Sequence, residues 1–452
     1  MTNKKIILEK DLIIKKVKTE VEPFYCGLSY QALCVNRDFS IPIFIYNLLP
    51  NEEADIKITY YSKKCCFAEV VKYRKLSPLR LILNKNEEKL YITGSAPLMS
   101  LDYENQLKFK QFLIKSLFER NLKFANVSPI ISSNCKQGYR NKISIHVDYQ
   151  KNKPILGFYK KYSHELVEQF DIYLGVYAIR EFYKNVLHSP TTEYNKQLNK
   201  AIFNLKPKQI VLRAPKTSLA TIEIIIDTEN KFNRKQIDKL EELNKQKPVF
   251  KFSIFQNKKW LNILDHKGID YEMEKYIFSV QNDSFYQINE GITNLIYNQI
   301  LDWIPLQNLI ICDAFAGVAT IGTYISSKAK KIYSIETNQN SINKAIENLN
   351  KNNIKNIEVI KEDANDWIVK NKEKIDIIIF DPPRSGLNLN TLESINKSNI
   401  KTIIYLSCDP KTLVRDLREL SKYDYLIKEV IPYDMFPQTY HVETLVMLRR
   451  QK

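Results

Sequence analysis

Six short runs rich in isoleucine and valine, separated by segments with helical periodicity, fill the C-terminal part of this 452-residue chain. Each run is almost continuously apolar, which is typical of strands that are buried on both faces of a sheet. Strands that alternate with helices favour parallel pairing, because the crossover helices then cover both faces. The sequence therefore predicts a mostly parallel α/β sheet, with strands at 309–313, 332–336, 357–361, 375–381, 402–407 and 444–449.

The chain is long enough for two or three domains, and its N-terminal part has a different pattern. Short alternating strands follow one another closely there, which predicts a small β-barrel over residues 1–80. Its expected strands are 31–35, 41–45, 54–58 and 67–71.

Residues 81–280 mix the two kinds of element, so we predict a central α+β domain there and a C-terminal α/β domain over 281–452. A helix at about 103–119 is a candidate for packing on the C-terminal domain. The other expected elements of the central domain are helices at 169–187 and 233–245 and strands at 142–149, 209–213, 220–227 and 249–255.

The formal net charge of +17 favours a polyanionic partner, because lysines and arginines displace counterions from phosphates. A membrane surface is the rival partner for a basic protein. However, no apolar run approaches the roughly 20 residues of a membrane span, and residues 1–5 lack a signal-peptide core. We therefore expect a cytoplasmic protein that binds nucleic acid.

The seven cysteines are scattered without metal-ligand spacing, and no C-x-x-C pair occurs. This usage predicts reduced thiols in a cytoplasm rather than disulfides or a zinc site. Glycine is scarce, with 10 residues in the chain, so each glycine is informative. Gly317, Gly322 and Gly386 all fall in candidate active-site segments.

The segment 309–322 has the pattern of a nucleotide-binding turn, in which an acidic residue ends a strand and a glycine-containing loop opens a helix. Asp313 ends the strand, Glu336 ends the next one, and Asp363 follows the third. Ala319 stands where a pyrophosphate-binding loop would favour glycine, so S-adenosylmethionine (SAM), which has no phosphate, fits better than a dinucleotide. A plain strand–helix turn without a ligand is the alternative, but the series of acidic strand ends argues against it.

Cys408 lies between an apolar run at 402–406 and a helix-like stretch at 411–420. Pro410 suits the first turn of that helix, where its missing N–H costs nothing. A thiol just ahead of a helix is exposed to unpaired N–H groups and to the positive end of the dipole, and both favour the reactive thiolate. The alternative is a buried structural cysteine at a strand end.

Together these motifs resemble the SAM-dependent RNA uridine-5-methyltransferases, which make 5-methyluridine in tRNA or large-subunit ribosomal RNA. Five segments carry the resemblance: 284–289 (Ser-Phe-Tyr-Gln-Ile-Asn), 313–322, 380–387 (Phe-Asp-Pro-Pro-Arg-Ser-Gly-Leu), 406–410 (Leu-Ser-Cys-Asp-Pro) and 441–444 (His-Val-Glu-Thr). Weaker likeness extends upstream to 139–142, 157–161 and 163–167, and the N-terminal strands are similar to the family's TRAM barrel at 48–52 and 77–80.

The resemblance implies a role for each candidate residue. Cys408 would be the nucleophile that adds to carbon 6 of uracil, Glu443 the general base that removes the carbon 5 proton, and Asp381 the group that bonds the uracil edge. The residues expected to hold the cofactor are Gln287, Asp313, Phe315, Gly317, Glu336, Asp363 and Asp381. Those expected to bind RNA are Arg140, Lys142 and Arg384.

Several of these residues also have a simpler interpretation. Asp381 suits a strand-end cap beside a rigid Pro-Pro turn, Glu443 an exposed position on an edge strand, and Gln287 a turn cap. Arg384 suits an ion pair with a carboxylate as well as contact with phosphate. His441 is expected to be positional rather than catalytic.

The chain departs from many relatives in one respect, since it lacks cysteines where they bind an iron–sulfur cluster, around 90–98 and 170–172. We therefore predict no such cluster. Arg384 stands where cytosine-5 enzymes are expected to place a second cysteine and amino-group methyltransferases an aromatic residue, so uracil is favoured. An NAD(P) enzyme is less consistent, because a full G-x-G-x-x-G is missing.

The expected partner is RNA, with ribosomal RNA favoured over tRNA, and the protein is expected to be a monomer. The target uridine must leave its stack to be reached from both sides, so we predict base flipping. The stretches 258–260 and 160–162 combine lysines with an aromatic residue, although solvated surface charge is the default interpretation of both. A catalytically silent RNA-binding factor of ribosome assembly is the hypothesis of a different class.

Overall fold

The computed structural model describes residues 8–18, 34–36, 39, 41–161, 163–216, 221–261, 268–306 and 308–451. The described residues form two compact units. The first unit is Met1–Arg120 with Gln438–Tyr440, and the second is Asn121–Pro437 with His441–Lys452. Within the described ranges, no helix is long and apolar enough to cross a membrane.

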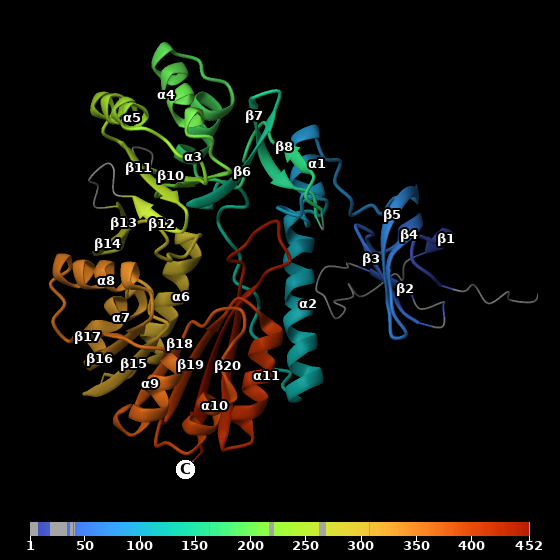
Figure 1. Cartoon of the computed structure of the whole chain (residues 1–452). Coiled ribbons are helices and arrows are strands. Elements are labelled where there is room, and N and C mark those ends of the chain that lie inside the picture. The colour runs from blue at the N-terminus through green and yellow to red at the C-terminus, as the bar shows by residue number, and fades with distance from the viewer. Residues whose placement is uncertain are drawn as a thin grey trace, which may run out of the picture. The chain divides into compact units, whose positions relative to one another are not determined.

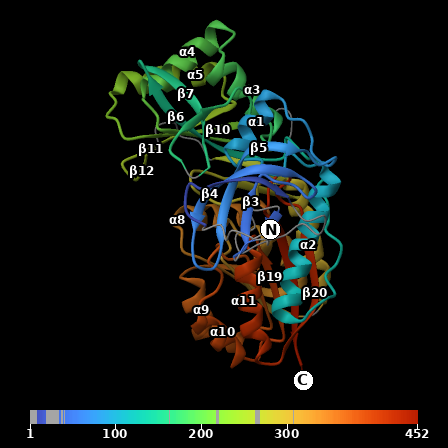
Figure 2. The same ribbon diagram turned by 90° about the vertical axis from the view of Figure 1, so that its right-hand side faces the viewer.

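The first unit contains a five-stranded sheet in the order β1-β4-β5-β3-β2 (Figure 1). Its strands β3, β4 and β5 are labelled in Figure 2. β3 and β5 pair in parallel, whereas the other neighbours are antiparallel. The elements are β1 (Ile13–Lys18), β2 (Cys34–Asn36), β3 (Ile43–Tyr46), β4 (Glu53–Tyr61), β5 (Cys66–Lys75), α1 (Lys85–Ile92) and α2 (Tyr103–Leu122).

Strands occur in the first unit where the sequence predicted them, although residues 31–33 lie outside the described part. The side chains of Ile43, Ile45, Ile56 and Ala68 form an apolar core between the strands. This confirms a strand-rich N-terminal region, while its closure into a TRAM-like barrel stays a prediction. The packing of the helix at 103–119 on the C-terminal domain also stays a prediction.

The second unit begins with a seven-stranded, mainly antiparallel sheet in the order β12-β11-β10-β9-β6-β7-β8. Helices cover the face that carries Ile143, Ile145, Ile210 and Ile224. The elements are β6 (Lys142–Gln150), β7 (Lys153–Tyr159), β8 (Leu166–Glu168), α3 (Tyr177–Phe182), the π-helix η1 (Tyr183–His188), α4 (Glu193–Asn204), β9 (Gln209–Arg213), β10 (Ile222–Thr228), α5 (Arg234–Gln246), β11 (Phe250–Gln256) and β12 (Lys259–Leu261).

The α+β character of this region is confirmed, but the helix predicted over 169–187 is wrong in its first half. The structure starts the helix at Tyr177, because the preceding residues pair with an extended segment instead. The N–H groups of Gly138 and Arg140 donate to the carbonyls of Tyr173 and Leu174. This tertiary pairing overrides the local helical pattern.

A hairpin that the sequence did not predict follows, made of β13 (Ile269–Met273) and β14 (Tyr276–Val280). Two asparagines, one in helix α8 (Gln339–Lys351) and one at its C-cap, form hydrogen bonds with the free edge of β14. Asn348 Oδ1 accepts from the Ser279 N–H at 2.7 Å, and Asn352 Oδ1 accepts from the Ile277 N–H at 2.9 Å. These side-chain amides protect an exposed strand edge, which would otherwise invite pairing with another chain.

The C-terminal sheet has the order β17-β16-β15-β18-β19-β21-β20, with β21 antiparallel to both of its neighbours (Figure 1). The doubly wound α/β fold predicted from the isoleucine-rich runs is confirmed. Its elements are α6 (Glu290–Trp303), β15 (Leu309–Ala314), α7 (Thr320–Ile325), the 3-10 turn η2 (Ser326–Lys328), β16 (Ala329–Glu336), α8, β17 (Ile357–Lys361), α9 (Ala364–Asn371), the 3-10 turn η3 (Lys372–Lys374), β18 (Ile377–Phe380), α10 (Leu389–Asn396), β19 (Thr402–Ser407), α11 (Pro410–Ser421), β20 (Tyr425–Tyr433) and β21 (Glu443–Arg450).

The strands of this sheet are buried on both faces, as their composition predicts. Ile377 and Ile379 of β18 belong to the cluster under α6 and α7, whereas Ile378 and Phe380 are buried on the opposite face. The sequence did not predict β20. Lys428 and Glu429 interrupt its apolar pattern, and its register shifts between Ile427 and Glu429.

Candidate active site

The candidate residues gather at the edge of the C-terminal sheet where the parallel strands end. Carboxyl ends of parallel strands meet at one edge of such a sheet, and ligands bind there in doubly wound folds. Because β21 runs antiparallel, its first residue, Glu443, lies at this same edge. Ser407 of β19 pairs with Thr444 of β21, so Cys408 follows β19 just where Glu443 begins β21.

The loop after β15 has an unusual backbone. Phe315, Gly317 and Ala319 all have positive φ, at 63°, 55° and 60°. Such a conformation is strained for phenylalanine and alanine, and strain of this kind concentrates at functional sites. It also explains why glycine would be favoured at position 319. The N–H groups of Ala316, Gly317 and Ala319 donate to Ile335, Glu336 and Ala316 within the protein.

Asp313 is buried beneath this loop. Its Oδ2 accepts from the Gly322 N–H at 3.0 Å and from Ser334 Oγ at 3.3 Å. Burial raises the pKa of its carboxyl to about 7, although these two hydrogen bonds favour the charged form. A Cβ on Gly322 would lie 2.9 Å from Asp313 Oδ2, so glycine permits this close approach. Asp313 therefore supports the loop from below.

Glu336 and Asp363 occupy the ends of the next two strands, as the sequence predicts. Glu336 Oε2 accepts from the Gly317 N–H at 2.9 Å, and its Oε1 accepts from the Asn338 N–H at 2.8 Å. Asp363 is the exposed N-cap of α9 and accepts from the Asn365 N–H at 2.8 Å. Both carboxylates are thus fixed by backbone N–H groups.

Gln287 and Asp381 lie together, although 94 residues separate them in the sequence. Gln287 Nε2 donates to Asp381 Oδ2 at 2.9 Å. Burial and the nearby charge of Asp313 raise the pKa of the Asp381 carboxyl, while the bond from Gln287 lowers it. Asp381 therefore holds a proton more readily than an exposed aspartate, which lets it act as a hydrogen-bond donor.

Cys408 and Glu443 share an electrostatic environment with Asp381 and Arg384. Burial, Glu443 and Asp381 raise the pKa of the Cys408 thiol to about 12, and Arg384 lowers it. Burial and Asp381 raise the pKa of Glu443, which Arg384 also lowers. Two carboxyl groups and a thiol are thus held close together, with one exposed guanidinium as their counter-charge.

These surroundings correct the expectation that the helix start makes Cys408 a thiolate. The first N–H groups of α11 are occupied, because Asp409 Oδ1 accepts from Lys411 and Thr412 at 2.9 and 3.2 Å. The Asp409 carboxylate thus offsets the positive end of the helix dipole. In the free protein the balance of burial and negative charge favours the protonated thiol.

The three residues expected to bind RNA have different surroundings. Arg384 is exposed beside the cluster, and Arg140 is half-buried with its Nε 3.2 Å from the hydroxyl of Tyr139. Lys142 is also half-buried. Burial and the charge of Arg213 lower the pKa of its ammonium group to about 8.

A buried ion pair that the sequence did not predict holds the segment before α6. Arg213 Nη1 donates to Glu223 Oε2 at 2.9 Å, and its Nη2 donates to the carbonyls of Asn282 and Ser284 at 3.1 and 3.0 Å. Asn141 Nδ2 donates to the Gln287 carbonyl at 2.9 Å. The central sheet therefore fixes the segment that carries Gln287. Arg213 directly follows the apolar run 210–212, and Glu223 lies within the apolar run 222–226, which was a usable signal of burial.

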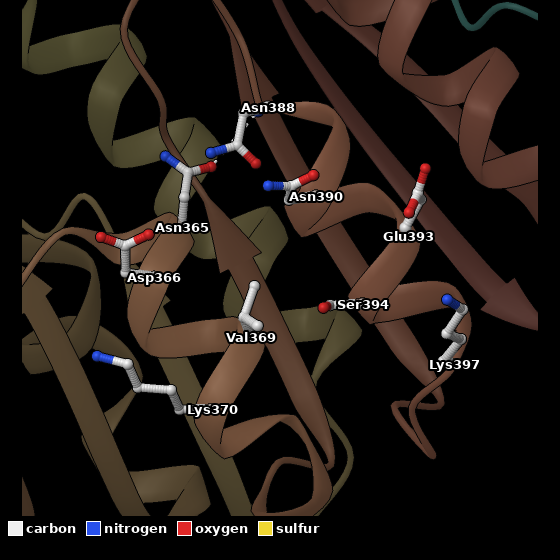
Figure 3. Close-up of a pocket in the computed structure, with 9 residues that line it drawn as sticks. All are labelled: Asn365, Asp366, Val369, Lys370, Asn388, Asn390, Glu393, Ser394 and Lys397. Carbon is white, nitrogen blue, oxygen red and sulfur yellow. Dashed lines mark hydrogen bonds between the residues drawn. The ribbon is translucent and has the colours of Figure 1, made fainter.

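A cavity of about 470 Å³ opens between α9 and α10 (Figure 3). At its upper end the Asn388 N–H donates to Asn365 Oδ1 at 3.4 Å. The lining contains both charges and several amides: Asn365, Asp366, Val369, Lys370, Asn388, Asn390, Glu393, Ser394 and Lys397. Asp381, Cys408 and Glu443 do not line this cavity, so it is separate from the cluster that these three residues form.

The strand order, the strained loop after β15 and the acidic strand ends together define a Rossmann-like methyltransferase domain. The comparisons with known proteins agree. The family described as tRNA (Uracil-5-)-methyltransferase matches residues 102–451. The chain therefore belongs to this family, which confirms both the resemblance and the enzyme class predicted from the sequence.

Relatives match over nearly the whole chain. An RNA methyltransferase of Bacillus cereus (strain ATCC 10987) is 31% identical over 95% of this chain and 96% of its own length. One of Lactiplantibacillus plantarum is 29% identical over 94% and 96%. The fold is similar to that of the Pyrococcus abyssi tRNA (uracil-54, C5)-methyltransferase in complex with S-adenosyl-L-homocysteine. That match has a TM-score of 0.70 and 21% identity, and covers 96% of this chain and 100% of that one.

Proposed function

We propose that this RNA (uracil-5-)-methyltransferase acts through a covalent bond between Cys408 and carbon 6 of the target uracil. The observation that carries the proposal is the placement of Cys408, Glu443 and Asp381 at one sheet edge, where burial, Glu443 and Asp381 raise the pKa of Cys408, and burial and Asp381 raise the pKa of Glu443. Carbon 5 of uracil is a weak nucleophile until carbon 6 is attacked, so the reaction needs a thiol, a base and a donor at one place.

The residues take three roles in this mechanism. The Cys408 thiol first releases its proton to the surrounding water. Its sulfur then forms a bond to carbon 6, and the electron pair of the 5,6 double bond moves through carbon 5 to oxygen 4 as an enolate. Asp381 stabilises the enolate by donating a hydrogen bond, which its raised pKa permits. Once carbon 5 carries the methyl group, Glu443 removes its proton. The double bond then reforms and the carbon–sulfur bond breaks, which returns the electron pair to Cys408.

The loop after β15 fits SAM better than a dinucleotide. A pyrophosphate needs loop N–H groups that are free to donate, but those of Ala316, Gly317 and Ala319 already donate within the protein. Glu336 beside this loop would also repel a phosphate. We assign Glu336 and Asp363 to the nucleoside part of the cofactor, with Phe315, Gly317 and Gln287 beside it and Asp313 below. When bound, SAM supplies an electrophilic methyl group for carbon 5.

The proposed substrate is large-subunit ribosomal RNA. The strand-rich N-terminal region and the large central domain resemble the branch that modifies this RNA, and the net charge of +17 suits a folded RNA. Arg140, Lys142 and Arg384 are the proposed contacts. Transfer RNA is the second candidate, favoured by the fold match with the Pyrococcus abyssi enzyme over that protein's full length.

The direct test uses RNA that contains 5-fluorouridine, because fluorine at carbon 5 blocks the proton removal assigned to Glu443. We expect the protein, SAM and this RNA to form a covalent complex that survives denaturation. Cys408→Ala should abolish the complex, whereas Cys135→Ala, which removes another free thiol, should not. A complex that persists in Cys408→Ala would disprove the assignment of the nucleophile.

The substrate is tested separately with methyl-labelled SAM and RNA from a strain that lacks the protein. Labelled 5-methyluridine in the ribosomal RNA fraction would support the proposal, and label confined to tRNA would replace it with the second candidate. If neither fraction contained labelled 5-methyluridine, the proposed function would be wrong.

A further inference from the structure

The loop that follows β18 carries Asp381 and Arg384 but has few backbone hydrogen bonds of its own. Pro382 and Pro383 have no N–H to donate. Gly386 closes a turn by donating its N–H to the Pro383 carbonyl at 2.9 Å. Other backbone groups of the loop are bonded by side chains of α11, the helix that begins two residues after Cys408.

Two adjacent residues of α11 make these bonds. Asp416 is fully buried, and its Oδ2 accepts from the Leu387 N–H at 2.9 Å and from the Tyr405 hydroxyl at 2.7 Å. Arg415 Nη2 donates to the carbonyls of Ser385 and Leu387 at 2.9 and 3.2 Å. Arg415 Nε also donates to Asp416 Oδ1 at 2.8 Å, so the two side chains act as one clamp.

Gly386 shows how closely the clamp fits the loop. Its φ is +71°, and a Cβ there would lie 2.5 Å from Asp416 Oδ2 and 2.6 Å from Arg415 Nη2. Any side chain at this position would push the clamp off the loop. A buried carboxylate that receives donors from a helix, a strand and a loop joins those elements in one arrangement.

We propose that the Arg415–Asp416 clamp is a positioning device that holds Arg384 beside Cys408, by fixing the loop of Arg384 to the helix that follows the cysteine. Arg384 directly precedes Ser385, whose carbonyl the clamp holds. The charged groups around Cys408 are Glu443, Asp381 and Asp409, which disfavour the thiolate, and Arg384, which favours it. Displacement of Arg384 would thus leave three carboxyl groups opposed to the thiolate.

The functional meaning of the clamp rests on the proposed role of Cys408 as the nucleophile, but the test of the clamp needs neither RNA nor SAM. The rate of Cys408 alkylation by iodoacetamide in the full-length protein is followed by mass spectrometry of the Cys408 peptide between pH 7 and 10.5. Only the thiolate reacts, so the rate at a fixed pH below the thiol pKa reports the thiolate population. A failure of the RNA reaction would leave this measurement unaffected.

We expect Arg384→Ala to slow alkylation at pH 9 by about 3- to 10-fold, because one nearby positive charge is lost. Arg415→Ala should also slow alkylation. The double variant should be no slower than Arg384→Ala alone, since both changes remove the same effect, the charge of Arg384 near the thiol. Arg415→Lys should also slow the reaction, because lysine keeps the charge but cannot reproduce the planar fork of donors.

Arg418→Ala is the matched control, since it removes the same charge from the same helix. Arg418 donates to Asn121 Oδ1 at 2.7 Å rather than to the loop. Cys408 in this variant should be alkylated at the rate of the unmodified protein. The proposal would be overturned if Arg415→Ala left the alkylation rate unchanged, or if Arg415→Lys kept full reactivity. It would also be overturned if the effects of Arg384→Ala and Arg415→Ala multiplied in the double variant.

Discussion

The two halves of the sheet edge use their acidic residues differently. At the ends of β15 and β16 and after β17, Asp313, Glu336 and Asp363 each accept at least one backbone N–H. Beyond β18 the bond to Asp381 comes from a side chain, Gln287. There burial, Glu443 and Asp381 raise the pKa of Cys408, and burial and Asp381 raise that of Glu443.

Under the proposed mechanism, this difference separates a binding half (Asp313, Glu336 and Asp363) from a reacting half (Asp381, Cys408 and Glu443). Carboxylates that accept N–H groups are held still and are suited to orient a ligand. Acidic groups whose pKa is raised by burial and by nearby charge can exchange protons near neutral pH. The first half therefore fits cofactor binding, and the second half fits proton removal and the changing charge of Cys408.

The largest effect is expected in the reacting half. Glu443→Gln should reduce 5-methyluridine formation by roughly 10²- to 10⁴-fold, since a general base contributes about that much. Because the block falls after attack by Cys408, a covalent protein–RNA complex should accumulate with ordinary uridine RNA, detectable by denaturing electrophoresis. Glu419→Gln, which changes a carboxylate that pairs with Lys422, should behave as the unmodified protein. Loss of activity without the complex would argue against this role.

The second effect tests whether Asp313 serves the binding half as a structural support. The folded protein raises the pKa of Asp313 to about 7, so the folded state holds the proton more tightly than the unfolded chain. Stability from this group is therefore fully present below about pH 4 and is lost as the pH rises through about 7. The contribution of Asp313 to the free energy of unfolding is on the order of 1.4 kcal/mol per unit of pKa difference, which amounts to a few kcal/mol at most.

Asp313→Asn cannot ionise but keeps an acceptor for the Gly322 N–H. It should therefore flatten the fall in the urea midpoint between pH 5 and 8. Asp302→Asn, at an exposed position, provides the control. An equal pH dependence in all three proteins would show that Asp313 does not titrate in this range.

The smallest effect separates the two halves directly. Glu336→Gln should weaken SAM binding about tenfold, the equivalent of roughly 1.4 kcal/mol, measured by calorimetry. Alkylation of Cys408 should stay unchanged, because Glu336 belongs to the binding half. If the substitution altered the alkylation rate as well, the two halves would not be independent.

Much of this site could be predicted because it follows the ends of strands. The isoleucine-rich runs place Asp313, Glu336 and Asp381 at one edge of a sheet, since parallel strands end together. Position 319, where a nucleotide-binding loop would favour glycine, could also be picked out from the sequence. The structure explains that preference by the positive φ of Ala319. The position of Glu443 followed only from the family resemblance, because no periodicity shows that its strand runs antiparallel.

Other features depended on contacts between distant residues. The helix predicted over 169–176 fails because residues 138–140 pair with that segment. The hairpin β13–β14 is completed by asparagines of α8, some 70 residues later. The ion pair of Arg213 and Glu223 joins two strands and reaches the segment of Gln287. Local propensity carries no information about such partners.

The sequence by itself determined the α/β fold and the order of the acidic strand ends, because these depend on residue type and spacing. The reactive groups were predicted from the family resemblance. Only the tertiary structure decided their charge states. Cys408 was predicted to be a thiolate from its place before a helix, yet burial, two carboxyl groups and the Asp409 cap favour the thiol. A pKa is set by the solvent and charges that surround a group in space, and that environment exists only in the folded chain.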